Sequence, residues 1–137
     1  MALIDKTTEI AADVEDVYAA WTAYEDYPTF METIETVTLV QEDRLHWVAV
    51  VEDDTYEWDA DLVEHVPDEK VSWRASDGRE TGEVRFEKLG TDKTKVTYQL
   101  EYDPKAWEGK PDTVRHWMNR RVERGLEEFK KMVEATA

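Results

Sequence analysis

The stretch YEWDADLVEH, residues 56–65, alternates between apolar and acidic side chains. One parity is apolar: Tyr56, Trp58, Ala60 and Leu62. The other parity is acidic: Glu57, Asp59 and Asp61. Because successive side chains of an extended chain point to opposite faces, this stretch predicts a strand with one apolar and one acidic face. The element that packs against the aromatic face decides the fold.

Strand-like runs with short turn signals between them lie on both sides of this stretch. They cover Val37–Val40, Leu45–Val51, Val71–Ala75, Val84–Phe86 and Val96–Tyr102. The turns include Asp77-Gly78, a strong hairpin signal. Even spacing and tight turns predict an antiparallel meander of six strands between residues 34 and 102.

The alternation of side chains within these runs predicts that one face of the sheet is exposed to solvent and the other is rich in aromatic rings. The inward aromatic residues are Trp47, Tyr56, Trp58, Trp73, Phe86, Tyr98 and Tyr102. The run Leu45–Val51 is apolar on both parities, so we expect it to be covered on both sides, with Trp47 pointing inward. The rings either fill an ordinary core or line a pocket for a flat or long apolar ligand.

Helical patterns flank the meander. A first strand, Leu3–Ile10, is followed by Asp13 as a helix N-cap and by an apolar stripe with helical spacing. Pro28 is placed where a second short helix can begin. After residue 111, a long helix is predicted over about Asp112–Ala135. Its stripe comprises Val114, Met118, Val122, Leu126, Phe129 and Val133.

Two residues of this long helix stand out. Arg121 points to the edge of the buried stripe. It either reaches solvent past the stripe or lies in a cavity with an anionic partner, because burial without a partner is costly. Gly125 lies on the buried face, where glycine costs about 1 kcal/mol against alanine. Its presence predicts that a bulky group, such as an aromatic ring, crosses the helix closely.

A twisted sheet with one apolar face must enclose something, and the last helix is the element long and apolar enough. The chain resembles the START/Bet v 1-like (SRPBCC) superfamily, in particular its polyketide cyclase/dehydrase-type branch of small stand-alone proteins. The resemblance covers nearly the whole chain and is carried by VYAAWTAYEDYPTFM (17–31), RLHWVA (44–49), YEWDADLVEHVPDEKVSWRASDG (56–78), GEVRFEKLGTDKTKVTYQLEYDP (82–104) and VRHWMNRRVERGLEEFKKMVE (114–134).

This resemblance implies an α+β helix-grip fold. In that fold a seven-stranded antiparallel sheet wraps around a long C-terminal helix, with two short helices after the first strand. The length of 137 residues suits a single domain, residues 1–137. The resemblance also implies a hydrophobic cavity between sheet and helix. Some members of the superfamily close and dehydrate polyketide chains there, and others bind sterols, lipids, quinones or plant metabolites without catalysis.

The expected function is therefore binding of a small hydrophobic molecule. The candidate ligand-binding residues are Trp47, Trp58, Ala60, Trp73, Phe86, Tyr98, Met118, Arg121, Tyr27 and Phe30. A cyclase/dehydrase-type enzyme with acid–base assistance and a non-catalytic lipid or quinone carrier are the alternatives. Arg121 and Tyr98 are the only catalytic candidates, and they match no catalytic motif. A third interpretation, an interaction module that uses the outer sheet, conflicts with the acidic parity of the strands.

Composition excludes several other classes. There is no cysteine, so thiolate metal sites, disulfides and a cysteine nucleophile are excluded. The spacing of His46, His65 and His116 predicts no metal site, and no cofactor is expected. The sequence has no glycine-rich phosphate loop. The N-terminal segment lacks a secretory pattern and no apolar run reaches the length of a membrane span, so a cytoplasmic location is expected.

The charge is strongly negative, with 33 acidic and 17 basic side chains and a net charge of −16. Such a field repels nucleic acid and anionic lipid surfaces, so neither is an expected partner. The acids are spread along the chain, which is typical of a solubilising surface; adaptation to high salt is the alternative. We expect a monomer or a weak homodimer.

Overall fold

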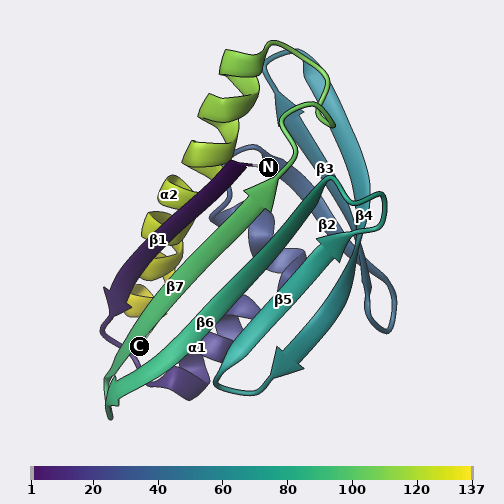
Figure 1. Cartoon of the computed structure of the whole chain (residues 1–137). Coiled ribbons are helices and arrows are strands. Elements are labelled where there is room, and N and C mark those ends of the chain that lie inside the picture. The colour runs from purple at the N-terminus through teal and green to yellow at the C-terminus, as the bar shows by residue number, and fades with distance from the viewer. Residues whose placement is uncertain (1, 137) are drawn as a thin grey trace.

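A seven-stranded antiparallel sheet curls around one long helix in the computed structural model, which describes residues 2–136 (Figure 1). The strands are β1 (Ala2–Ile10), β2 (Ile34–Gln41), β3 (Arg44–Val51), β4 (Asp54–Val66), β5 (Lys70–Ala75), β6 (Glu80–Gly90) and β7 (Lys93–Tyr102). The helices are α1 (Val14–Trp21), the 3₁₀ helix η1 (Tyr24–Thr29) and α2 (Pro111–Thr136). The predicted helix-grip fold is confirmed.

The strand order is β1-β7-β6-β5-β4-β3-β2. Strands β2 to β7 form the predicted meander, in which each strand pairs with the next along the chain. Strand β1 pairs with β7 over its whole length, from Ala2↔Tyr102 to Ile10↔Thr94. The two short helices carry the chain from the β1 edge of the sheet to the β2 edge.

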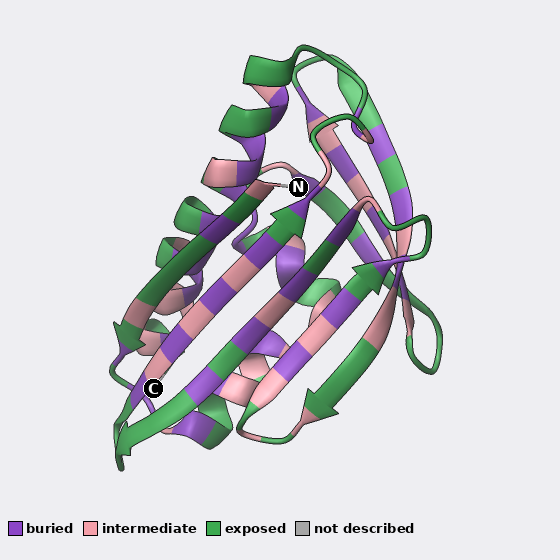
Figure 2. Cartoon of the chain, viewed as in Figure 1, coloured by how far each residue is buried: buried purple, intermediate pink, exposed green. Residues whose placement is uncertain are grey.

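Burial along the strands follows the predicted parity, which Figure 2 shows as alternating colours along β7 and β5. Trp47 is buried and pairs with Trp58, as predicted. The prediction that β3 is covered on both sides was wrong. Val48 and Val50 are only half-buried, because the helices lie on the inner face and the outer face of β3 stays open to solvent.

Helix α2 buries the predicted stripe against the sheet and the short helices. Phe129 is fully buried and packs on Trp21 and Phe30, with ring centroids 5.1 and 5.2 Å away. No aromatic ring crosses Gly125, contrary to the prediction. The nearest atom to a Cβ built there is Cγ of Met31, at an ordinary contact distance of 3.7 Å. The flexible methionine fills the space next to the glycine.

Candidate ligand-binding site

A buried ion pair joins α2 to the start of β6. Nη1 of Arg121 donates to Oε1 of Glu80 at 2.7 Å, and Nη2 donates to Oε2 at 2.9 Å. Both side chains have an exposed fraction of 0 %. Trp73 donates a third hydrogen bond to the same carboxylate, from Nε1 to Oε2 at 3.2 Å. The Arg121 side chain therefore lies buried between α2 and the sheet, and its anionic partner is a residue of the protein itself.

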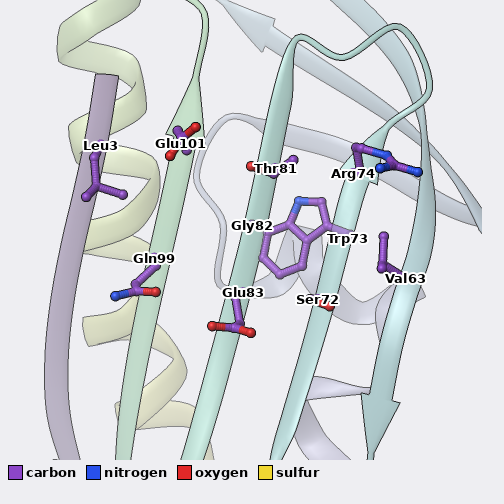
Figure 3. A pocket seen from close by; sticks show the side chains of 10 residues that line it. All are labelled: Leu3, Val63, Ser72, Trp73, Arg74, Thr81, Gly82, Glu83, Gln99 and Glu101. Atoms are coloured by element: carbon purple, nitrogen blue, oxygen red, sulfur yellow. The ribbon is translucent and has the colours of Figure 1, made fainter. Parts of the chain in front are cut away.

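The alternation of β6 explains how an acidic residue reaches the interior. Glu80 has the same parity as Gly82, Val84 and Phe86, which all face inward. Gly82 pairs with Trp73, and Figure 3 shows the Trp73 ring beside Gly82 between β5 and β6. A Cβ built at Gly82 would lie 2.1 Å from Cζ2 of Trp73, so only glycine lets the ring take this position. The indole then reaches the Glu80 carboxylate.

Aromatic rings surround the guanidinium. Cζ of Arg121 lies 5.1 Å from the ring centroid of Trp47 and 5.4 Å from that of Trp58. These two rings stack on each other, with centroids 5.6 Å apart and planes 10° apart. Such contacts favour a cation over the ring faces. Sδ of Met118 lies 3.8 Å from Nη1. The charged pair is surrounded by apolar side chains, so electrostatic interactions within it are weakly screened.

Several polar atoms around the ion pair have no hydrogen-bond partner among the described residues. They are Nε of Arg121, the hydroxyl of Tyr98, and Nε1 of Trp47 and of Trp58. All four groups are able to donate a hydrogen bond. A buried donor without an acceptor costs about 1–3 kcal/mol. Tyr98 and Arg121 lie close enough to influence each other's pKa, and all four donors are buried away from solvent.

The protonation states at this site follow from burial and from the ion pair. Burial raises the pKa of Tyr98 to about 12, against the opposing effect of Arg121. Tyr98 is therefore a neutral phenol at physiological pH. For Arg121, burial acts to lower the pKa, but the charge of Glu80 outweighs it and the pKa is raised. Arg121 therefore stays a cation throughout the physiological range.

A pocket of about 220 Å³ lies beside this cluster, and Arg121, whose side chain is fully buried, is the cluster residue in its lining. It lies between the segment after η1, the end of β3 and the first half of α2. Its lining consists of Met31, Glu32, Thr33, Val51, Glu52, Thr113, His116, Trp117, Arg120 and Arg121. At the rim, Arg120 Nη2 donates to both Glu32 carboxylate oxygens at 2.9 and 3.0 Å. Trp117 Nε1 donates to Oγ1 of Thr33 at 2.7 Å.

The predicted site residues divide into two groups. Arg121 lines the pocket, and the side chains of Trp47, Trp58, Trp73, Tyr98 and Met118 surround it or its partner Glu80. Tyr27 adjoins this group, since it packs on Trp47 and its pKa, which burial raises, also responds to Tyr98 and Arg121. The other three residues lie elsewhere in the core, where Ala60 pairs with Leu45 and Ala75, Phe86 packs on Tyr18, and Phe30 packs on Phe129.

Sequence reasoning missed Glu80, Trp107 and Trp117. The parity of β6 was a usable signal for Glu80, since it lies two residues before Gly82. Trp117 follows the helical stripe by one turn from Val114. Trp107 lies in the loop between β7 and α2, where no periodicity applies. Its ring packs edge-on against Trp58 and Trp117, with centroids 4.9 and 5.2 Å away.

A second hollow, of about 310 Å³, lies on the outer face of the sheet (Figure 3). The side chains around it are mostly polar or charged, with the exposed Leu3 and Val63 at its two sides. The ion pair of Arg121 and Glu80 belongs to the opposite, inner face of the sheet. We therefore place the candidate site at the inner pocket.

Among residues 2–136, no group of three or more His, Asp or Glu side chains is arranged to hold a metal ion. No described helix is both long and apolar enough to span a membrane.

Comparison with known proteins agrees with this architecture. Residues 10–131 match the model of a family described as polyketide cyclase/dehydrase and lipid transport. An uncharacterised 17.2 kDa protein of Streptomyces lincolnensis is 32% identical over 136 residues, which cover 98% of this chain and 91% of that protein.

Solved structures show the same fold at lower identity. A START superfamily protein from Mycobacterium smegmatis superposes with a TM-score of 0.81 at 15% identity, covering 98% of this chain and 99% of that one. The Zhui aromatase/cyclase from Streptomyces sp. R1128 superposes with a TM-score of 0.74 at 17% identity, covering 98% and 92%.

Proposed function

Because the chain belongs to the polyketide cyclase/dehydrase and lipid transport family, we propose that it binds a small apolar molecule in the pocket that ends at Arg121. The observation that supports it best is a surface pocket, lined in part by Met31, Val51 and Trp117, that lies beside the buried ion pair of Arg121 and Glu80. A core that served stability alone gains little from such a pair, since apolar residues of similar volume are often as stable.

The volume of the pocket limits the size of the ligand. Pockets for drug-sized ligands measure about 300–1,000 Å³, and this pocket of about 220 Å³ lies just below that range. It suits a molecule of one or two rings. Apolar contacts come from Met31, Val51 and Trp117, and the polar end of the ligand lies toward Arg121.

An enzyme of the cyclase/dehydrase type is the second candidate. It is favoured by the buried hydroxyl of Tyr98, which lies near the permanent cation of Arg121. With a pKa of about 12, this phenol would donate a hydrogen bond or a proton to a carbonyl oxygen, and would act as a general acid. A non-catalytic carrier would use the same donors to hold the ligand and release it unchanged.

Calorimetric titration with 2-acetylnaphthalene, a two-ring ketone, tests the proposal. We expect micromolar affinity, which corresponds to about −8 kcal/mol. Thr113→Phe should remove binding, because the larger side chain fills the pocket from α2. Asn119→Phe makes a similar change on the same helix outside the pocket lining and should leave the affinity unchanged. Absence of binding, or equal binding by both variants, would overturn the pocket assignment.

Mass spectrometry of small molecules extracted from the purified protein complements this titration. A co-purifying one- or two-ring compound that is lost in Thr113→Phe would identify the natural ligand class. Incubation of that compound with the protein then separates the two candidates, since an enzyme changes its mass or spectrum and a carrier returns it intact.

A further inference from the structure

We propose that the side chain of Trp107 is an internal competitor for ligand. It fills a chamber formed by the rings of Tyr56, Trp58 and Trp117. A flat apolar molecule of the size of indole occupies this chamber when the loop 103–110 withdraws the ring. The chamber is a second binding space, and it shares only the Trp117 ring with the pocket of the proposed function. The two spaces are therefore tested independently.

The contacts of Trp107 are those of a bound apolar ligand. The residue lies in the loop between β7 and α2 (Figure 1), yet it is only 2 % exposed. Its ring packs edge-on against Trp58, Trp117 and Tyr56, with ring centroids 4.9, 5.2 and 5.9 Å away. Its indole nitrogen has no hydrogen-bond partner among the described residues. Ring contacts therefore hold this side chain, and a free bicyclic molecule makes contacts of the same kind.

Few bonds fasten the loop in this position. The hydroxyl of Tyr56 donates to the carbonyl oxygen of Glu108. Within the part of the chain that the structure describes, this is the only hydrogen bond between residues 104–109 and a residue outside the loop. The two other hydrogen bonds of these residues are accepted by Asp103, at the start of the loop. A segment with so few external bonds opens at a lower free energy than the whole domain unfolds.

Gly109 makes the closed position of the loop possible. Its φ of 117° lies in a region that glycine adopts at no steric cost and other residues rarely adopt. A Cβ at this position would lie 2.9 Å from the hydroxyl oxygen of Tyr56, which holds the loop through Glu108. Gly109→Ala therefore destabilises the closed position without removing the Trp107 ring.

Arg79 covers the inserted ring from the turn between β5 and β6. Its Cζ lies 4.8 Å from the ring centroid of Trp107, and Nη2 lies 2.7 Å from Oδ2 of Asp77. A cation over an indole ring favours the inserted position. The backbone amide of Asp103 donates to the carbonyl oxygen of Arg79 at 3.0 Å. The turn and the loop therefore form one cover over the chamber.

Competition between an internal ring and a ligand has a defined signature. A ligand that binds only the open form has an apparent dissociation constant equal to its intrinsic value divided by the open fraction. Any change that favours the open form therefore tightens binding, even where the Trp107 ring is still present. A cavity made simply by removing the ring gives no such gain in a variant that keeps it.

Calorimetric titration with 3-methylindole, which is the tryptophan side chain as a free molecule, tests the proposal. Trp107→Ala should bind this probe at least tenfold more tightly than the wild type. Gly109→Ala should bind it at least threefold more tightly. Gly90→Ala, whose added Cβ meets nothing within 4 Å, should match the wild type.

The glycine variants decide the outcome even if Trp107→Ala does not fold. No gain in Gly109→Ala, or an equal gain in Gly90→Ala, would overturn the proposal. Each titration is repeated with Thr113→Phe, which fills the pocket of the proposed function, and the gains should persist. Gains that vanish in this background would place the probe in that pocket instead of the chamber. Persistent gains without any binding of 2-acetylnaphthalene would overturn the proposed function alone.

Hydrogen exchange of the wild-type protein tests the withdrawal of the ring itself. The indole N–H groups of Trp107 and Trp21 are both buried without a partner among the described residues, but Trp21 belongs to α1. In D₂O the signal of Trp107, assigned with Trp107→Phe, should exchange at least tenfold faster than that of Trp21. Saturating 3-methylindole should speed the exchange of Trp107 further. Equal rates for the two groups, or slower exchange of Trp107 with the probe bound, would contradict the proposal.

Discussion

Arg121 and Glu80 are the residues whose chemistry depends most on each other. Removing either charge from water costs several kcal/mol, and this cost is offset by the two hydrogen bonds that Arg121 donates to Glu80. Trp73 contributes a further hydrogen bond to the carboxylate. Arg121 therefore acts as one half of a neutral unit.

A double-mutant cycle measures this dependence. Arg121→Met leaves Glu80 buried without a counter-ion, and Glu80→Gln does the same to Arg121. Each should lower the free energy of unfolding by about 3–5 kcal/mol. The double variant should lose at least 1 kcal/mol less than the sum of the single changes, as measured by urea denaturation. Additive losses would mean that the pair is not energetically coupled.

Two glycines give a matched comparison at the same scale. Gly82→Ala places a Cβ 2.1 Å from the Trp73 ring, so the ring must move, and we expect a loss of about 1–3 kcal/mol of stability. Gly125→Ala meets only Met31 at 3.7 Å and should stabilise α2 by roughly 0.5–1 kcal/mol. Urea denaturation of both variants checks these signs, and a stabilising Gly82→Ala would refute the packing of Trp73 against β6.

At the scale of elements, local periodicity was sufficient to predict every strand and α2, because strands and helices repeat over a few residues. The pairing of β1 with β7 was not predicted, because the two strands lie about 90 residues apart in the sequence. Local periodicity could not predict the ion pair. Its two residues lie 41 positions apart, and their contact depends on both the register of β6 and the direction of α2. Arg121 was predicted as a candidate from its place beside the helical stripe, but its partner was not.

The outer face of β3 and β4 supports a prediction about pH. His46 Nδ1 lies 2.8 Å from Asp59 Oδ1 and Nε2 lies 3.2 Å from Glu57 Oε1. The hydrogen bond to Asp59 raises the pKa of His46 against the effect of burial, and Glu57 adds to the rise. A raised pKa means that the stabilisation is complete below the unfolded value of about 6.5 and is lost as pH rises through the folded value.

His46→Gln isolates this contribution. At pH 6 the variant should be less stable than the wild type. The difference should stay under about 1 kcal/mol, because the His46 side chain is partly exposed. The difference should shrink by pH 8.5. Denaturant unfolding at the two pH values measures it, and a difference that grows with pH would contradict the sign.

The whole molecule combines an apolar inner side, which contains the candidate site, with a surface that carries most of its 33 acidic side chains. A net charge of −16 repels itself, and salt screens that repulsion as the Debye length falls from about 10 Å at 0.1 M to about 3 Å at 1 M. The melting temperature should therefore rise between low salt and 1 M sodium chloride. An unchanged or lower value would show that local pairs such as Lys93–Glu9 and Lys6–Glu123 outweigh the net charge.

The central claim is that the pocket lined by Trp117 and Arg121 holds a small apolar ligand. A ¹H–¹⁵N NMR spectrum that includes arginine Nε–H and tryptophan indole signals tests it directly, with Arg121→Met used to assign the Arg121 signal. Addition of 2-acetylnaphthalene should shift the indole signal of Trp117 together with the Nε–H signal of Arg121, because both residues line the pocket. If the ketone binds while these signals stay in place and those around Gly82 on the outer hollow move instead, the account is contradicted.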